Sequence, residues 1–203
     1  MKITDEFRAY FDGEDLEDLD NEASTIFGLD SDLRIALVNE GWTQFARENK
    51  APAEFFEQYV LGSNYVDCLP NPLRAFFEKH IRQSIATHET WEFDYLCPTP
   101  QNFRQFRMKV LPLAGGAGCL ISNGILVEMP HLSEAEADAN VQHSYVADSG
   151  FITQCSHCRR TRHVVDATRW DWVPKFVESP PDNVSHGICP TCFSYFYPSV
   201  DRG

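Results

Sequence analysis

Two Cys-x-x-Cys pairs near the end of the chain constrain its fold more than any other feature of the sequence. The first pair is Cys155 and Cys158, and the second, Cys189 and Cys192, follows thirty residues later. Two residues between cysteines let both thiolates of a tight turn face one ion, and two such turns supply the four sulfurs of a tetrahedral zinc site. The spacing therefore predicts a structural zinc ion held by these four cysteines, with no open position for water.

Other cysteine chemistries remain as alternatives. A thioredoxin-like dithiol uses one pair at a helix start within a βαβ pattern, which this sequence does not show. Disulfides, or a zinc site switched by oxidation, would make the cysteines themselves a sensor, and an iron–sulfur cluster also takes four cysteines. His157 and His186 flank the pairs. Either could replace a sulfur, but with four cysteines present we expect both histidines outside the ligand set.

A short basic patch follows the first pair and consists of Arg159, Arg160, Arg162 and His163. Such a patch can meet phosphates or an acidic surface. No helix with base-reading spacing follows it, and the whole chain holds 30 acidic against 17 basic residues, a formal charge of −13. Because a chain this acidic repels polyphosphates and anionic membranes, we expect neither nucleic acid nor membrane as a partner.

The acidic excess is concentrated in an N-terminal segment, residues 1–23. Residues 1–30 hold ten Asp and Glu against Lys2 and Arg8. We expect a solvated, partly disordered lead-in; the alternative is a short helix that docks on the next domain or on a second subunit. The start, MKITDEFRAY, contains no apolar stretch of a secretory signal. No apolar run approaches the about 18–20 residues that span a bilayer, so we expect a cytoplasmic protein.

Residues 24–129 have the pattern of an α+β domain. TIFGLD and LRIALVN flank the turn-prone DSD and predict a hairpin, which a short helix with Trp42 and Phe45 follows. NPLRAFFEKHIRQSIATH predicts a long helix, because its apolar residues recur at intervals of three and four. TWEFDYLC, FRQFRMKVLPL and GCLISNGILVE then predict three strands. This order predicts a five-stranded antiparallel sheet with helices packed on one face.

The stretch from Tyr95 to Glu128 resembles a run common in bacterial sensory PAS domains. In that family a cysteine-containing strand and a proline-bearing turn precede an aromatic–x–Met–basic–Val–x–Pro–Leu strand and a Gly-rich turn. The matching positions are Cys97, Pro98, Phe106, Met108, Lys109, Val110, Pro112 and Leu113. The family often has Trp before the Phe, where this chain has Gln105. The resemblance covers about half of the chain and implies a PAS-like sensory domain.

A small molecule is the ligand that such a domain could hold. The aromatic residues expected to line its cavity are Trp42, Tyr65, Phe76, Phe77 and Trp91. The alternative is that these rings only fill the core.

The end of the chain, residues 151–203, is similar to a cysteine-rich module found after PAS or receiver domains in bacterial signalling proteins. The matching positions are Cys155, Cys158, Arg159, Arg162, Trp170, Ser185, His186, Gly187, Ile188, Cys189, Pro190, Cys192, Tyr197 and Pro198. The insertion-like ESPPDN departs from that pattern and should alter only a loop. We expect a small zinc-ribbon-like fold here. Residues 130–150 are polar and form a predicted linker, in which Ser133 and Glu136 fit a helix capping box.

No catalytic motif accompanies these features. The sequence lacks a phosphate-binding glycine loop with Lys, a GxSxG elbow and an HExxH helix. We therefore predict that the chain is not an enzyme. The resemblances imply a bacterial signalling protein that acts through a small molecule or a signalling partner protein, and pairs as a homodimer through residues 5–20 or 132–146. The alternative is a redox- or zinc-responsive regulator in which the cysteines are the sensor.

Overall fold

The computed structural model describes residues 1–69, 71–131 and 143–198. They form two compact units. The first comprises Met1–Tyr95 and Phe106–Ile125, and the second comprises Leu96–Gln105 and the chain from Leu126 onward. The predicted boundaries at residues 129 and 151 differ from this division, because residues 96–105 and 126–131 group with the cysteine-rich module. The predicted capping box at Ser133 and Glu136 lies outside the described residues.

The larger sheet has six strands in the order β1-β3-β2-β6-β5-β4. Their bounds are β1 Lys2–Ile3, β2 Thr25–Asp30, β3 Ile35–Val38, β4 Trp91–Leu96, β5 Asn102–Pro112 and β6 Gly118–Pro130. The five predicted strands are present in the predicted order. The prediction of five strands is wrong by one, because β1 adds an edge by pairing Lys2 with Val38 and Ile3 with Leu37. A strand of two residues is too short for the alternating pattern that identifies strands.

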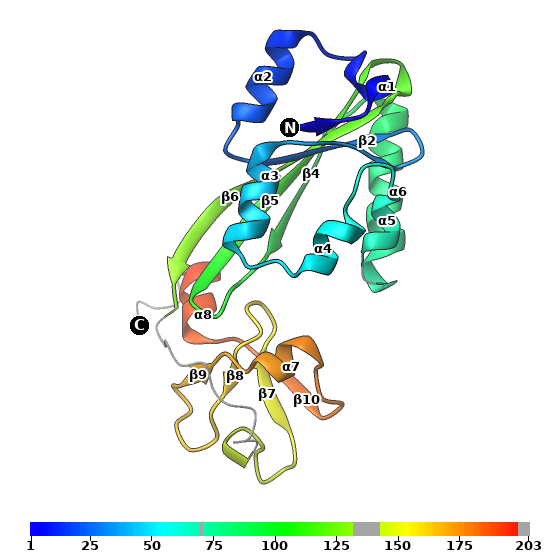
Figure 1. Cartoon of the computed structure of the whole chain (residues 1–203). Coiled ribbons are helices and arrows are strands. Elements are labelled where there is room, and N and C mark those ends of the chain that lie inside the picture. The colour runs from blue at the N-terminus through cyan, green and yellow to red at the C-terminus, as the bar shows by residue number, and fades with distance from the viewer. Residues whose placement is uncertain (70, 132–142, 199–203) are drawn as a thin grey trace. The chain divides into compact units, whose positions relative to one another are not determined.

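Four helices between β3 and β4 cover one face of this sheet (Figure 1). They are α3 Glu40–Glu48, α4 Ala53–Gln58, α5 Tyr65–Cys68 and α6 Asn71–Thr87. The long predicted helix is thus present as α6, and its buried Phe77 and Ile81 pack with strand residues such as Leu29, Ile35 and Val110. Burial of this face supplies most of the apolar core of the first unit.

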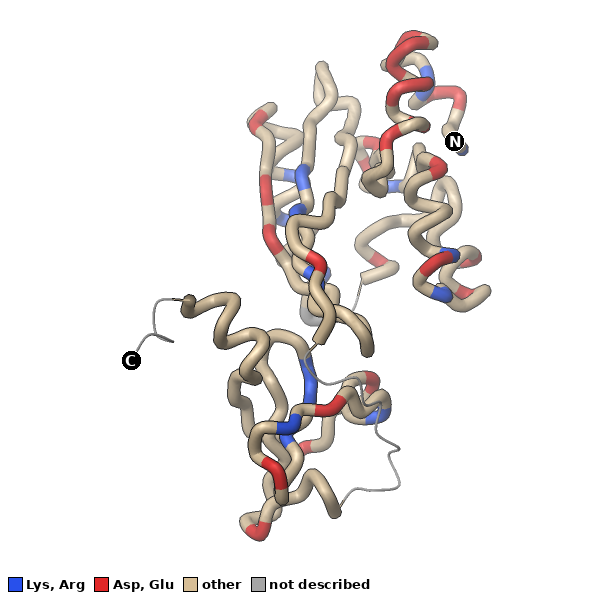
Figure 2. The backbone as a smooth tube through the Cα atoms, turned by 90° about the vertical axis from the view of Figure 1, so that its left-hand side faces the viewer, with Lys and Arg blue, Asp and Glu red and all other residues tan. Residues whose placement is uncertain are grey.

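The N-terminal segment covers the opposite face. Its helices are α1 Asp5–Arg8 and α2 Gly13–Asn21, which bear most of the acidic residues of this segment (Figure 2). Phe7 is buried against Ile26, Leu37 and Leu120, with Leu16 and Leu19 of α2 packed beside it. Helices therefore lie on both faces, and the prediction of one covered face is wrong. The segment is an ordered cap, as the docking alternative predicts, because a few well-spaced apolar residues suffice to bury it.

One buried amide fastens this cap to the domain. Asn39 caps α3, and its Oδ1 accepts hydrogen bonds from the backbone N–H of Ile26 at 2.9 Å and of Trp42 at 2.8 Å. Its Nδ2 donates to the carbonyl oxygens of Leu19, Glu22 and Ser24 at 3.0–3.2 Å. The Asn39 side chain therefore connects the end of α2, the start of β2 and the start of α3 by hydrogen bonds.

The second unit contains a four-stranded sheet in the order β10-β7-β8-β9. The strands are β7 Ile152–Cys155, β8 Thr161–Arg162, β9 Trp170–Asp171 and β10 Val184–Gly187, and the helices are α7 Pro174–Glu178 and α8 Pro190–Phe196. β10 runs parallel to β7, which sets Gly187 opposite Cys155. Among the described residues of both units, no helix is long and apolar enough to cross a membrane.

Candidate metal centre

The structure brings all four predicted ligands together. The Sγ atoms of Cys155, Cys158, Cys189 and Cys192 lie within 4.8 Å of one another, and each residue is at most 1% exposed. The sulfurs of Cys158 and Cys189 are 3.5 Å apart. Residues more than thirty positions apart in the chain thus form one buried cluster.

Two tight turns aim these sulfurs inward. Cys155 ends β7, and its N–H bonds to the carbonyl oxygen of Arg160 at 2.7 Å, while Arg159 turns the chain with a φ of 66°. In the second turn, Cys189 caps α8 and its Sγ accepts from the N–H of Cys192 at 3.5 Å. The Cys189 N–H points to the Cys155 Sγ at 3.4 Å. Backbone amides directed at sulfur are the arrangement that stabilises thiolates.

The spacing of the sulfurs fits a single tetrahedral ion. A zinc–sulfur bond of about 2.3 Å places the sulfurs of a tetrahedron about 3.8 Å apart. The 3.5 Å between the sulfurs of Cys158 and Cys189, and the upper limit of 4.8 Å for all four, agree with this value. A disulfide needs about 2.05 Å between sulfurs, and none of the four cysteines forms one. A cluster of several irons would hold the four sulfurs farther apart than one ion does.

The electrostatics of the cluster also call for a cation. Hydrogen bonds among the four thiols lower the pKa values of Cys155 and Cys189 and raise those of Cys158 and Cys192. The protein alone therefore favours thiolates at only part of this buried cluster. Four thiolates become compatible only when a divalent ion offsets their charge.

Arg160 is the charged side chain beside the cluster. It is 2% exposed, its Nη1 donates to the Trp170 carbonyl oxygen at 3.0 Å, and its Nη2 donates to the Pro100 carbonyl oxygen. Burial lowers its pKa, while the negative charge of Cys158 and Cys189 acts in the opposite direction. The basic patch predicted around Arg160 is thus divided: Arg159 and Arg162 are exposed, and Arg160 lies inside the unit. Nothing in the residue spacing distinguishes these three arginines.

A cavity of 40 Å³ adjoins the cluster and is lined by His131, Arg160 and Cys189 among others. His131 is 5% exposed, and neither ring nitrogen has a hydrogen-bond partner among the described residues. Burial, and next the nearby Arg160 charge, lower the pKa of His131 to about 4. The cavity is large enough for a water molecule, which would give the neutral imidazole a partner. The flanking histidines of the sequence lie elsewhere: His157 stacks on Phe196 at 4.3 Å, and His186 is exposed.

The five aromatic residues predicted to line a ligand cavity lie in two places. Trp42 and Tyr65 line an internal cavity of only 20 Å³. Phe76, Phe77 and Trp91 pack together between α6 and β4, with ring centroids 5.3–6.1 Å apart. The cavity that Trp42 and Tyr65 line is thus too small for an organic ligand.

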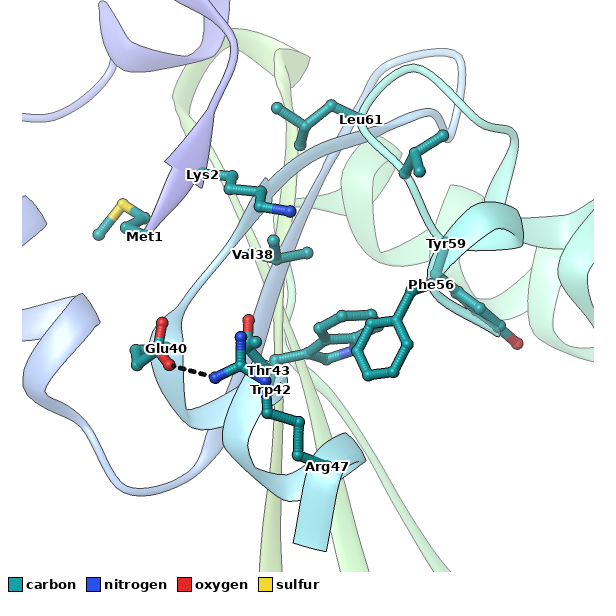
Figure 3. A pocket seen from close by; sticks show the side chains of 11 residues that line it. Met1, Lys2, Val38, Glu40, Trp42, Thr43, Arg47, Phe56, Tyr59 and Leu61 are labelled. Atoms are coloured by element: carbon teal, nitrogen blue, oxygen red, sulfur yellow. Dashed lines mark hydrogen bonds and ion pairs between the residues drawn. The ribbon is translucent and has the colours of Figure 1, made fainter. Parts of the chain in front are cut away.

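A larger pocket of 610 Å³ lies on the outside of the first unit, between β1, the end of β3 and helices α3 and α4 (Figure 3). It is lined by Met1, Lys2, Val38, Glu40, Trp42, Thr43, Arg47, Phe56, Tyr59, Val60 and Leu61. Of the five aromatic residues predicted to bind a ligand, Trp42 lines this pocket. The other lining residues come from four elements, so no local pattern in the sequence points to them.

The protein is thus of mixed α/β class, with an antiparallel sheet, helices and a cluster of four cysteines that could bind a metal. No protein-family model and no curated protein matches the sequence. Several solved structures match part of the chain. One of them is the phage VqmA–DPO complex, with a TM-score of 0.41 and 14% sequence identity. The match covers 55% of this chain and 51% of the phage chain.

Two further matching structures are PAS domains. That of a protein from Colwellia psychrerythraea has a TM-score of 0.41 and 13% identity, over 56% of this chain and 94% of that one. The PAS domain of Bordetella pertussis BvgS has a TM-score of 0.37 and 17% identity, and the match covers 64% of this chain and 93% of that domain. The chain spans about half the length of the phage protein that it matches.

Proposed function

We propose that this chain is a cytoplasmic regulatory protein without enzymatic activity. One structural zinc ion orders its second unit, and its first unit binds a small molecule or a partner protein and signals through protein contacts. The observation that supports the zinc site best is the group of four buried sulfurs within 4.8 Å of one another. The sequence resemblance to sensory PAS domains and to the cysteine-rich signalling module supports the regulatory role.

A structural role for zinc follows from the coordination that four sulfurs allow. A tetrathiolate ion has no open position for water or substrate, so it contributes folding free energy and no chemistry. The four-stranded sheet of the second unit has short strands of two to four residues, and one of the buried clusters of this unit consists of the four cysteines, Trp170 and Phe103. A unit of this kind gains much of its stability from the ion at its centre.

The alternative, a redox- or zinc-responsive switch, requires that an oxidant reaches a thiolate. The four cysteines are 0–1% exposed, which favours a protected site over a sensing one. We also propose a homodimer. The apolar side of α1 and α2 already packs on its own sheet, so of the two expected pairing segments we favour residues 132–146, most of which lie outside the described residues.

Metal analysis of the purified protein tests the zinc assignment. We expect about one zinc per chain and substantial loss in Cys189→Ser, because three sulfurs leave the ion partly uncoordinated. The matched control is Cys97→Ser, which changes an exposed cysteine outside the cluster and should keep its zinc. Unchanged zinc in Cys189→Ser would refute the site. Rapid zinc release by modest hydrogen peroxide, together with a change in dimerisation, would favour the redox switch.

A further inference from the structure

We propose that the 610 Å³ pocket of the first unit binds a small aromatic carboxylate. This inference rests on the proposed small-molecule binding by that unit, and it names both the place and the chemical class. Ligand pockets in proteins commonly measure about 300–1,000 Å³, whereas the internal cavity of 20 Å³ admits no more than water. Of these two cavities, the outer pocket has room for an organic ligand.

The walls of the pocket suit a flat apolar group. Trp42 and Phe56 meet edge to face, with ring centroids 6.2 Å apart and an interplanar angle of 89°. Val38 and Leu61 add to the apolar lining, and the rings of Trp42 and Phe56 border the open space (Figure 3). An aromatic ligand would add an offset or edge-on partner to these rings, a geometry that contributes about 0.5–1.5 kcal/mol per pair.

The charges at the rim favour an anion. Lys2 forms no ion pair with any described residue, although the chain holds 30 acidic residues. Arg47 and Glu40 form an ion pair of 3.3 Å, but their side chains are 66% and 55% exposed. Exposed pairs of this kind are weak, so the Arg47 guanidinium can turn to a ligand. Two cations against one carboxylate leave a positive rim for a negatively charged ligand.

The same pocket reaches the core of the domain. Val38, Trp42 and Tyr59 line both the outer pocket and the internal cavity. A ligand seated on Trp42 therefore contacts side chains that also pack against Phe27 and Tyr65 of the core. A ligand in the outer pocket would therefore affect the packing of core side chains, although the ligand itself stays outside the core.

Ligand-observed NMR on the zinc-loaded full chain tests this inference. The probes are 3-phenylpropionate, 4-phenylbutyrate and 1-naphthaleneacetate, each beside its uncharged primary amide. We expect each carboxylate to bind about fivefold more tightly than its amide, the ratio that corresponds to about 1 kcal/mol for an exposed ion pair. Lys2→Gln should remove this preference, and Phe56→Ala should weaken both members of each pair.

Two further variants keep the test independent of folding. Val60→Trp places a large side chain at an exposed lining position and should block binding while the fold is retained. Lys79→Gln changes an exposed lysine of α6 and should leave every affinity unchanged. The inference is overturned when no carboxylate binds below about 1 mM, or when binding persists in both Phe56→Ala and Val60→Trp. Binding that persists in these variants would leave small-molecule binding intact and refute only this pocket, and the zinc content of each sample reports on the metal site separately.

Discussion

At the scale of single residues, Arg160 is the side chain whose role differs most from what its sequence neighbourhood indicates. It lies in a run of arginines, yet it alone of Arg159, Arg160 and Arg162 is buried. A zinc ion with four thiolates carries a net charge of −2, and a buried cation beside it reduces the cost of keeping that charge out of water. Its two backbone acceptors hold the guanidinium in place.

We predict that Arg160→Met weakens zinc binding by about 10- to 100-fold, the usual cost of losing a residue that supports metal ligands. Arg160→Lys should recover part of the loss, because it restores the charge but not both hydrogen bonds. Competition with a chromophoric chelator measures the affinity. Arg162→Met, at an exposed neighbouring position, is the control; equal affinities of the Arg160 and Arg162 variants would contradict the role given to Arg160.

At the scale of elements, the docking of α1 on the sheet depends on one glycine. A Cβ on Gly28 would fall on the ring of Phe7 and close to the Cβ of Leu37. Gly28 lies in β2 on the face that Phe7 covers. Because Gly28 has no side chain, the Phe7 ring of α1 can pack directly on the strand. The short helices of the N-terminal cap are held by this contact and by the Asn39 hydrogen bonds rather than by their own propensity.

We therefore predict that Gly28→Ala loosens the N-terminal cap, because the Phe7 ring must leave this position. Hydrogen exchange should become at least about tenfold faster in residues 5–21, as expected for a loss of about 1.4 kcal/mol of local stability. Gly124→Ala in β6 is the matched control, since the nearest atom to its new Cβ is 4.0 Å away. Unchanged exchange in Gly28→Ala would show that the cap does not need this contact, and unchanged zinc content would confine the effect to the first unit.

At the scale of the whole molecule, the two compact units have different sources of stability. The first is built on a large apolar cluster that contains no metal ligand. The described part of the second unit has two smaller clusters, and four of the six buried residues in one of them are the cysteines. We therefore predict that a strong zinc chelator at neutral pH removes hydrogen-exchange protection from residues 151–198 while β2, β3 and α6 keep theirs.

Acid should act in the same direction as the chelator. Zinc ligands must be thiolates, so protons compete with the ion and its affinity falls as pH decreases. The second unit should lose its protection on acidification before the first unit unfolds, and added zinc should shift that loss to lower pH. Simultaneous loss of both units, with or without added zinc, would contradict the division of stability proposed here.

Several features of this protein follow from local patterns and were accessible without a structure. The spacing of Cys155, Cys158, Cys189 and Cys192 predicts a common ion because a two-residue spacer by itself sets the geometry of each turn. The helix Asn71–Thr87 and the order of five strands follow from the spacing of apolar residues, which records which side of each element is buried.

Other features depend on contacts between residues far apart in the sequence, and only the tertiary structure decided them. Phe7 meets Gly28 across the sheet, β1 pairs with β3 over two residues, and Arg160 bonds to Pro100 sixty residues away. Residues of β1, β3, α3 and α4 line the outer pocket, so no single segment of the sequence predicts its size or its charge. A sequence pattern reports how each segment divides into buried and exposed sides; the partner that covers a side is chosen by packing in three dimensions.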